Sequence, residues 1–298
     1  MNLRQAILAT LAYHDIFDYP LTIEEIHQYL IGGKASLKSV EKVLNRLTDD
    51  KKISRRRGYY YLRNHIGLVN RRLQRKKYSK FKFKKALFFA NLLKIIPTLK
   101  LVAISGALAM ENSHKDDDID LILVTSKGTL WTTRFLANIL LFPFKRKPQP
   151  QLTINHSPST NNKACLNIFL DESSLKISDQ NLYTAHETCQ MKPIWDRDGT
   201  YSRLVSANNW VKKFLPNWQT CDSEHGTRNK NKNVSRVTYH LSPIEIFLKK
   251  FQLWYMRSKI TTEKIEDTQL FFHPQNKEEW VMGEYQKRLK ILGLINRI

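Results

Sequence analysis

Residues 101–125 read LVAISGALAMENSHKDDDIDLILVT, and this stretch decides the fold that the sequence predicts. An apolar run reaches Gly106, a polar segment follows, and Asp118 and Asp120 open a second apolar run. Because side chains alternate between the two faces of a strand, the two carboxylates are expected on one face, roughly 6–7 Å apart along the chain. Two carboxylates next to a glycine turn with free backbone N–H groups are suited to hold divalent metal ions against phosphates.

This pattern resembles the signature of the nucleotidyltransferase superfamily related to DNA polymerase β. The signature is an apolar residue, Gly, then Gly or Ser, a gap of about ten residues, and a strand that reads Asp-apolar-Asp or Asp-apolar-Glu. Gly106 and the triplet at 118–120 fit this signature. Ala107 stands where the family usually has Ser or Gly, so a hydroxyl contact to phosphate is missing.

The resemblance implies a Mg²⁺-dependent enzyme that moves a nucleoside monophosphate from a nucleoside triphosphate to an acceptor hydroxyl and releases pyrophosphate. Active members usually place a third carboxylate on a later strand. In the strand predicted over 164–170, Asn167 lies inside the strand and Asp171 follows its end. Asn167 in the third position would leave the site one negative charge short. The implied residues are Asp118 and Asp120 as catalytic groups, Ser105, Gly106 and Ala107 for nucleotide binding, and Asp118, Asp120 and Asp171 as metal ligands.

The positive charge of the chain is concentrated in one window. The formal net charge is +22, and residues 51–100 hold 17 Lys or Arg and no Asp or Glu. A block of this kind is typical of a surface that binds a polyanion, either nucleic acid or an anionic membrane surface. A solvated basic face without a partner is the alternative.

Three predicted helices and a hairpin precede and enter this block. Helices are expected over 3–14, over 22–30 and after the cap Ser36, and a β-hairpin is expected over 53–62. Residues 1–64 therefore resemble a winged helix-turn-helix domain, in which the third helix would enter the major groove and the hairpin would lie on the phosphates. Acidic residues beside the third helix would repel phosphate, so a protein contact stays open as the alternative use. The candidate nucleic-acid-binding residues are Lys38, Lys42, Arg46, Arg55, Arg56 and Arg57.

The predicted fold class is α+β, with an N-terminal winged helix, a central mixed-sheet nucleotidyltransferase core and a C-terminal helical region. The basic linker helix between the first two parts is expected to dock on the sheet or to lie on anionic lipid. The expected ranges are 1–64 for the winged helix, 65–98 for the linker helix, 99–175 for the core with a strand over 151–155, and 176–298 for the helical region with a flexible loop near 219–235.

Several side chains on the predicted helices are expected in the core. His186 is interpreted as a packed core residue, because a lone histidine beside apolar neighbours is more often that than a catalyst. The helix that begins after Ser242 is expected to bury its aromatic residues, namely Phe247, Phe251, Trp254 and Tyr255. The linker helix is expected to have an apolar face made of Phe81, Phe83, Leu87, Phe88, Leu92 and Ile95.

Cysteine usage and hydropathy indicate the cellular compartment in which the protein is expected. Cys165, Cys189 and Cys221 are odd in number, widely spaced and without a metal-ligand pattern, which favours a reducing cytosol. The N-terminal stretch meets an acidic residue early and has no small-residue cleavage site, and no apolar run approaches 18 residues. The sequence therefore predicts a soluble, cytoplasmic protein without a transmembrane segment.

Three functions stay open from the sequence alone. The first is the active nucleotidyltransferase, whose acceptor could be a nucleic-acid end, a protein side chain or a small molecule. The second is a catalytically degenerate nucleotidyltransferase fold that acts as a nucleic-acid-binding regulator, which Ala107 and the unassigned third carboxylate favour. The third is a membrane-surface protein that uses residues 71–96.

Overall fold

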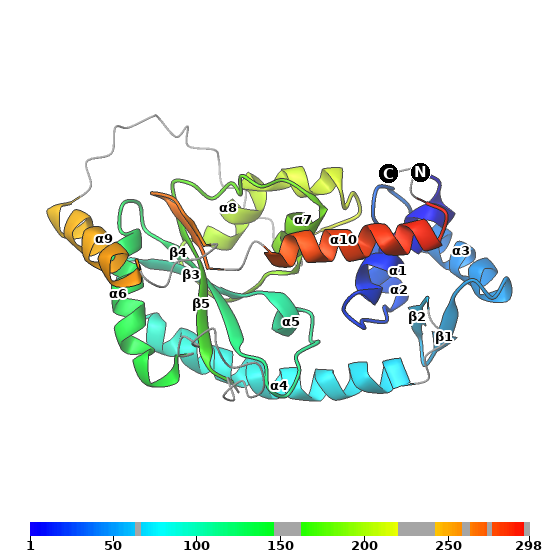
Figure 1. Cartoon of the computed structure of the whole chain (residues 1–298), viewed down its shortest axis with the longest axis horizontal. Coiled ribbons are helices and arrows are strands. Elements are labelled where there is room, and N and C mark those ends of the chain that lie inside the picture. The colour runs from blue at the N-terminus through cyan, green and yellow to red at the C-terminus, as the bar shows by residue number, and fades with distance from the viewer. Residues whose placement is uncertain (63–66, 146–161, 220–241, 258–262, 273–275, 295–298) are drawn as a thin grey trace.

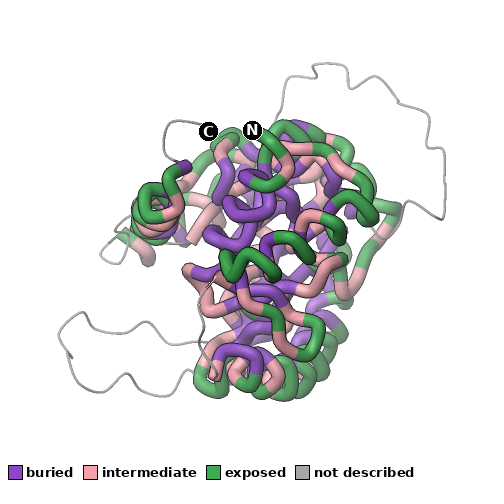
Figure 2. The backbone as a smooth tube through the Cα atoms, turned by 90° about the vertical axis from the view of Figure 1, so that its right-hand side faces the viewer, coloured by how far each residue is buried: buried purple, intermediate pink, exposed green. Residues whose placement is uncertain are grey.

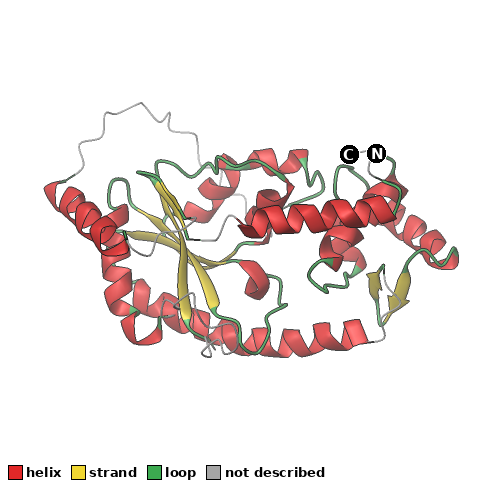
Figure 3. Cartoon of the chain, in the orientation of Figure 1, coloured by secondary structure: helices red, strands yellow, loops and turns green. Residues whose placement is uncertain are grey.

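The structure, a computed structural model, describes residues 1–62, 67–145, 162–219, 242–257, 263–272 and 276–294. The strand expected over 151–155, residues 220–235 of the expected loop, and Cys221 lie outside these ranges. Within them the chain is α+β, with helices on both faces of a mixed sheet (Figure 3). No helix in this part of the chain is both long enough and apolar enough to cross a membrane.

Three helices and a β-hairpin form one end of the molecule (Figure 1). Asn2 and Thr22 each accept a hydrogen bond from the backbone N–H three residues on and complete capping boxes, which fixes where the first two helices begin. The hairpin turns at Arg57 and Gly58, whose φ angles of 52° and 80° suit a two-residue turn. These expected elements are α1 (Leu3–Asp15), α2 (Ile23–Gln28), α3 (Leu37–Asp49), β1 (Ser54–Arg56) and β2 (Tyr59–Tyr61).

The other end of the molecule contains a six-stranded mixed sheet among the described residues, in the order β6-β3-β4-β5-β8-β7. β4 and β5 are parallel, and the remaining neighbours are antiparallel. The strands are β3 (Leu99–Ile104), β4 (Ile119–Thr125), β5 (Ala164–Asp171), β6 (Lys192–Asp196), β7 (Lys264–Ile265) and β8 (Gln269–Phe271).

The range 176–298, expected to be helical, contains α7, α8, α9 and α10 but also the strands β6, β7 and β8, which extend the sheet on both sides. These strands are two to five residues long. Segments this short carry little periodic signal, and pairing with a neighbouring strand decides their conformation more than their own composition does.

Each face of the sheet has its own helical cover. Leu101, Ala103, Ile122 and Val124 face one core, and the alternate residues of the same strands face the other. The first face packs against α7 (Leu182–Gln190), α8 (Thr200–Ala207) and α10 (Asn276–Ile291), and the second against α4 (Gly67–Leu93) and α6 (Leu130–Leu140). Shorter helices are α5 (Gly106–Ala109), η1 (Phe142–Phe144) and η2 (Asn209–Lys213).

The first core continues from the sheet into the N-terminal helices. Buried backbone runs through the centre of the molecule in Figure 2. Tyr13 of α1 stacks on His186 of α7 with ring centroids 4.0 Å apart, and Asp15 accepts a hydrogen bond from Arg288 of α10 at 2.9 Å. His186 is thus a packed core residue as expected, and the described residues 1–62 share their core with the sheet.

Helix α4 packs on the sheet, but through a different face from the expected one. Phe81 and Ile95 of the expected face are 61% and 64% exposed. The helix turns a different side to the sheet because polar side chains in its N-terminal half form hydrogen bonds. Their partners are in residues 1–62, here called the N-terminal unit, and in the loop before β4. The buried stripe is Arg72, Arg75, Ser79 and Lys82, followed by Ala86, Phe89, Ala90 and Leu93.

Helix α9 (Pro243–Met256) turns its aromatic face to solvent, so the expectation that this face is buried is wrong. Phe247 and Trp254 are 66% and 71% exposed. The opposite face holds buried Glu245, whose carboxylate accepts hydrogen bonds from backbone N–H groups at the start of α6. Since a buried carboxylate must keep such partners, these bonds fix the rotation of α9 and leave the aromatic side chains outside.

Candidate active site

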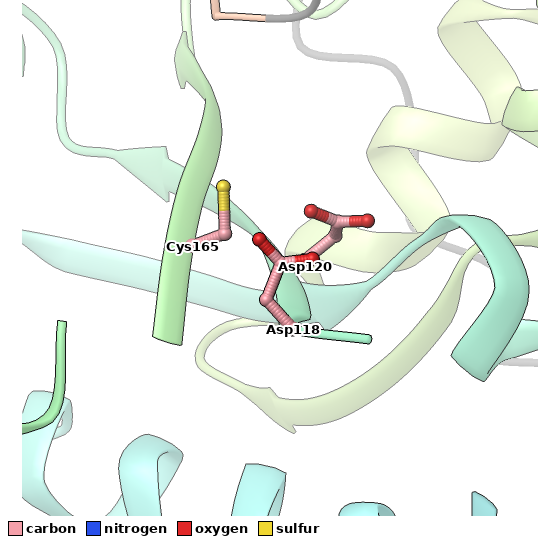
Figure 4. A group of neighbouring side chains, drawn as sticks. All are labelled: Asp118, Asp120 and Cys165. Carbon is pink, nitrogen blue, oxygen red and sulfur yellow. The ribbon is translucent and has the colours of Figure 1, made fainter. Parts of the chain in front are cut away.

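Asp118 and Asp120 lie at the start of β4, the first directly before the strand and the second inside it. Both side chains are partly buried, and each has a carboxylate oxygen that lies within 4.8 Å of the other's and of the Cys165 sulfur on β5. Figure 4 shows these side chains side by side at the start of the two parallel strands. The structure therefore brings together the two carboxylates that the sequence pairs, and adds a thiol that the sequence analysis did not assign to the site.

The loop that leads into Asp118 is held by α4. The Lys82 ammonium donates to the backbone carbonyls of Lys115 and Asp117, and the Ser79 hydroxyl accepts from the backbone N–H of Ser113. Lys82 is 1% exposed, and burial lowers the pKa of its ammonium. Sequence reasoning missed this role because it counted Lys82 with the basic block. Its helical register with Ser79 and the buried apolar residues further along was the available signal.

The turn at Gly106 lies against Asp120. Gly106 has a φ of 61°, and a Cβ built on it would lie 3.2 Å from Oδ2 of Asp120. The backbone N–H of Ser105 donates to the carbonyl of Asp120 at 3.2 Å. The Ser105 side chain makes no capping bond to α5, and its hydroxyl is buried without a hydrogen-bond partner. Ala107 is exposed at the outer side of the same turn.

We expect Gly106→Ala to displace the Asp120 carboxylate. The positive φ costs roughly 1–2 kcal/mol for any side chain, and the new methyl group meets the carboxylate besides. Gly199→Ala is the matched control, because Gly199 has a φ of 64° and open space around its Cβ position. Urea unfolding should therefore show that both variants are destabilised, whereas only Gly106→Ala should weaken divalent-metal binding at Asp118 and Asp120, by roughly ten- to a hundredfold. Equal metal affinity of the two variants would contradict the positioning role of Gly106.

The environment of Asp120 disfavours its charged form. Burial, and after it the charge of Asp118, raises the pKa of Asp120 from 3.8 to about 7. Between these two pH values the folded chain keeps a proton that the unfolded chain releases, so the stability contributed by this group falls as the pH rises toward 7. Above pH 7 the metal-free protein bears the full unfavourable free energy of holding the Asp120 carboxylate in its charged form.

Asp120→Asn should therefore stabilise the chain in EDTA, and more so at higher pH. Asparagine carries no charge, so the advantage of the variant should grow by about 3 kcal/mol between about pH 4.5 and pH 8, at 1.36 kcal/mol per pKa unit. Urea unfolding of both proteins at each pH measures this difference and cancels the contributions of other groups. An advantage that does not change with pH would contradict the raised pKa.

Asp171, expected as a metal ligand, is not part of this cluster. β5 pairs with β4 so that Cys165 lies opposite Asp120, while Asp171 lies opposite Thr125 at the far end of the strands. A bulge at Asn167 shifts the register, so Asp171 shares the face of Thr125 and not that of Asp120. The Asp171 carboxylate instead accepts hydrogen bonds from the backbone N–H groups of Gly128 and Ser173.

A cavity of about 110 Å³ opens between this face of the sheet and α7, with Ser105 in its wall. Most of the wall is apolar, and Tyr183 and Glu187 of α7 contribute to it. Burial raises the pKa of Glu187, whose charge acts on Asp120. Lys264 of β7 lines the same cavity and pairs with Asp179 at 3.0 Å. Asp118, Asp120 and Cys165 are not among the residues that line this cavity, and its own carboxylates come from Asp179, Glu187 and Glu278.

The candidate nucleic-acid-binding residues lie at the other end of the molecule, on α3 and the hairpin (Figure 1). They are on the surface, and Arg56 is the one that is partly buried. The structure does not bring them together with Asp118 and Asp120. The set comprises Lys38, Lys42 and Arg46 on α3, and Arg55, Arg56 and Arg57 on the hairpin.

The donor atoms fit a Mg²⁺ ion only in part. Asp118 and Asp120 supply carboxylate oxygens, which Mg²⁺ prefers. The third donor is the sulfur of Cys165, whereas Mg²⁺ binds oxygen ligands and thiolates select softer metals. The two carboxylates thus suit a divalent cation, and the thiol departs from the set expected for Mg²⁺.

Comparisons of the chain with protein-family models, with curated proteins and with solved structures give no match.

Proposed function

We propose that the chain is a divalent-metal-dependent nucleotidyltransferase with its site at Asp118 and Asp120. The observation that carries the proposal is the approach of the Gly106 turn to the Asp120 carboxylate, with Asp118 alongside. This arrangement puts an uncapped helix start, where backbone N–H groups lack side-chain partners, next to two oxygen-donor ligands. Backbone N–H groups that donate hydrogen bonds and a cation held by carboxylates together stabilise the negative charge of phosphate oxygens.

Each group then has a distinct role. Asp118 and Asp120 hold the cation, which when bound supplies positive charge to the phosphate oxygens. The turn from Ser105 to Ala107 holds the terminal phosphates through backbone N–H groups. The acceptor oxygen forms a bond to the α-phosphorus in line, and its proton passes to solvent. The bond from the α-phosphorus to the bridging oxygen breaks, and pyrophosphate leaves. Lys82 acts as a positioning residue, since it fixes the loop that carries Asp118.

The test is the transfer of label from nucleoside triphosphates into a cell extract. ATP, CTP, GTP and UTP carrying label at the α-phosphorus are supplied with Mg²⁺, Mn²⁺, Co²⁺ or Zn²⁺, and products are resolved with nucleases and proteases. Label from the α-position, with none from the γ-position, is the expected result, and EDTA should abolish it. Transfer of γ-label instead would indicate phosphoryl transfer and overturn the proposal.

Nucleic-acid binding without catalysis is the second candidate function. The specific observation in its favour is the exposure of Lys38, Lys42 and Arg46 along one side of α3, beside a hairpin with Arg55 and Arg57 exposed. We propose a winged-helix-like use of this surface, whether or not the enzyme is active. Counterion release predicts that affinity for duplex DNA or RNA falls steeply as salt rises. Steep salt dependence without any label transfer would favour this candidate over the enzyme.

A further inference from the structure

Cys165 occupies the position next to Asp120 that a third metal ligand would take. The parallel register of β4 and β5 sets Cys165 directly opposite Asp120, on the same face of the sheet. Its thiol is partly buried and donates a hydrogen bond to the Asp120 carboxylate. The sulfur and one oxygen from each of the two carboxylates all lie within 4.8 Å of one another.

This set of donors matches the ligand preferences of zinc rather than those of magnesium. Zn²⁺ binds Cys sulfur and Asp oxygen, and catalytic zinc sites have three protein ligands and a fourth position open to water or substrate. Mg²⁺ demands near-octahedral oxygen ligands and loses its water reluctantly.

A second observation on the same side of the site points to a ligand. The Ser105 hydroxyl is 1% exposed and lacks a hydrogen-bond partner. Ser105 precedes Gly106, which lies against Asp120, and it lines the cavity that Ile122 and Glu187 also line. A buried hydroxyl without a partner is costly, so a bound group that accepts or donates a hydrogen bond there is favoured. Phosphate oxygens carried by a metal ion at the neighbouring carboxylates would satisfy it.

We propose that Asp118, Asp120 and Cys165 form a three-ligand site for a thiophilic divalent ion of the Zn²⁺ type. The inference rests on the proposed function, and it specifies the metal that this site selects. On binding, the Cys165 S–H bond breaks, its proton passes to solvent, the sulfur forms a bond to the ion and a water ligand of the ion is released. The hydrogen bond from the thiol to Asp120 is replaced by shared coordination.

The test uses Co²⁺ as a spectroscopic substitute for Zn²⁺ on the full-length protein. A thiolate bound to Co²⁺ gives a charge-transfer band in the near ultraviolet, which carboxylate ligands alone do not give. The band should appear on titration with Co²⁺ and be displaced by Zn²⁺ but not by Mg²⁺. Cys165→Ser should abolish it and weaken Co²⁺ binding at least about tenfold. Cys221→Ser is the matched control and should keep both the band and the affinity.

A second variant separates failure of the metal assignment from failure of the proposed function. Cys165→Asp restores an all-carboxylate set, so label transfer by this variant should prefer Mg²⁺, whereas transfer by the parent should prefer Zn²⁺ or Co²⁺. A band that survives Cys165→Ser, or Co²⁺ binding without a band, would overturn the thiol ligand even if label transfer with Mg²⁺ is observed. A band that depends on Cys165, without label transfer under any metal, would support the metal site and overturn the proposed nucleotidyltransferase function.

Discussion

Replacing Asp118 and Asp120 together with asparagine should lower label transfer from α-labelled nucleotide at least about a hundredfold. Loss of a group outside the ligand shell already costs ten- to a hundredfold in metal affinity or activity, and this variant removes both carboxylate ligands at once. Asparagine keeps the size of each side chain but not its charge. The variant should fold, because metal-free Asp120 is a buried charge whose removal stabilises the chain.

The matched control for this variant is Asp116→Asn/Asp117→Asn. These two residues lie in the same acidic run but outside the cluster of Asp118, Asp120 and Cys165. Initial rates of label transfer at saturating metal, with circular dichroism to confirm folding, measure the difference. Retention of most activity by the Asp118 and Asp120 variant would remove the basis of the proposed site.

Arg72→Ala should destabilise the chain by about 2–4 kcal/mol, slightly less than the 3–5 kcal/mol typical of a broken buried ion pair. The Arg72 side chain is 5% exposed, donates to Glu25 at 2.6 Å and lies over the Tyr19 ring at 3.5 Å. Truncation therefore removes the charged partner of the Glu25 carboxylate and a cation–π contact, while the Tyr19 hydroxyl and the Thr22 N–H still donate to that carboxylate. Glu25 is 23% exposed, so water compensates for part of the loss.

Arg71→Ala provides the comparison on the same helix. Arg71 is 42% exposed and approaches Asp18 at 3.6 Å, which is the geometry of a surface ion pair. Such pairs contribute roughly 0–1 kcal/mol. Urea unfolding of both variants measures the difference, and equal destabilisation would mean that the Arg72 pair does not hold α4 to the N-terminal unit.

The stretch at 101–125 gave reliable local predictions because its signals are periodic and short in range. Two apolar runs predicted two strands, and the alternation of side chains placed Asp118 and Asp120 on one face. The N-terminal helices could be predicted equally well, because Thr22 and Ser36 have the sequence context of caps and accept the expected hydrogen bonds. Local rules were sufficient in both regions.

The misplaced residues depend on contacts between distant parts of the chain. The parallel register of β4 and β5 puts Cys165 beside Asp120 and Asp171 at the far end of the strands, and the bulge at Asn167 turns Asp171 to the other face. The composition of β5 predicts neither the register nor the bulge. The face of α4 was misjudged because buried Arg72 and Lys82 have partners far away in sequence. Periodicity identifies an apolar face, and the helical register of Ser79 and Lys82 with the buried apolar residues further along was the one signal for this buried polar stripe.

The shared core of α1, α7 and α10 has a consequence for how such a chain can evolve. A unit of three helices and a hairpin that had a core of its own could be moved between genes and keep its fold. Here the stacking of Tyr13 on His186 and the bond from Arg288 to Asp15 make the surface of α1 depend on segments near the other end of the chain. A recombination event that moved residues 1–64 alone would expose these buried groups, so the unit can be inherited only together with its sheet.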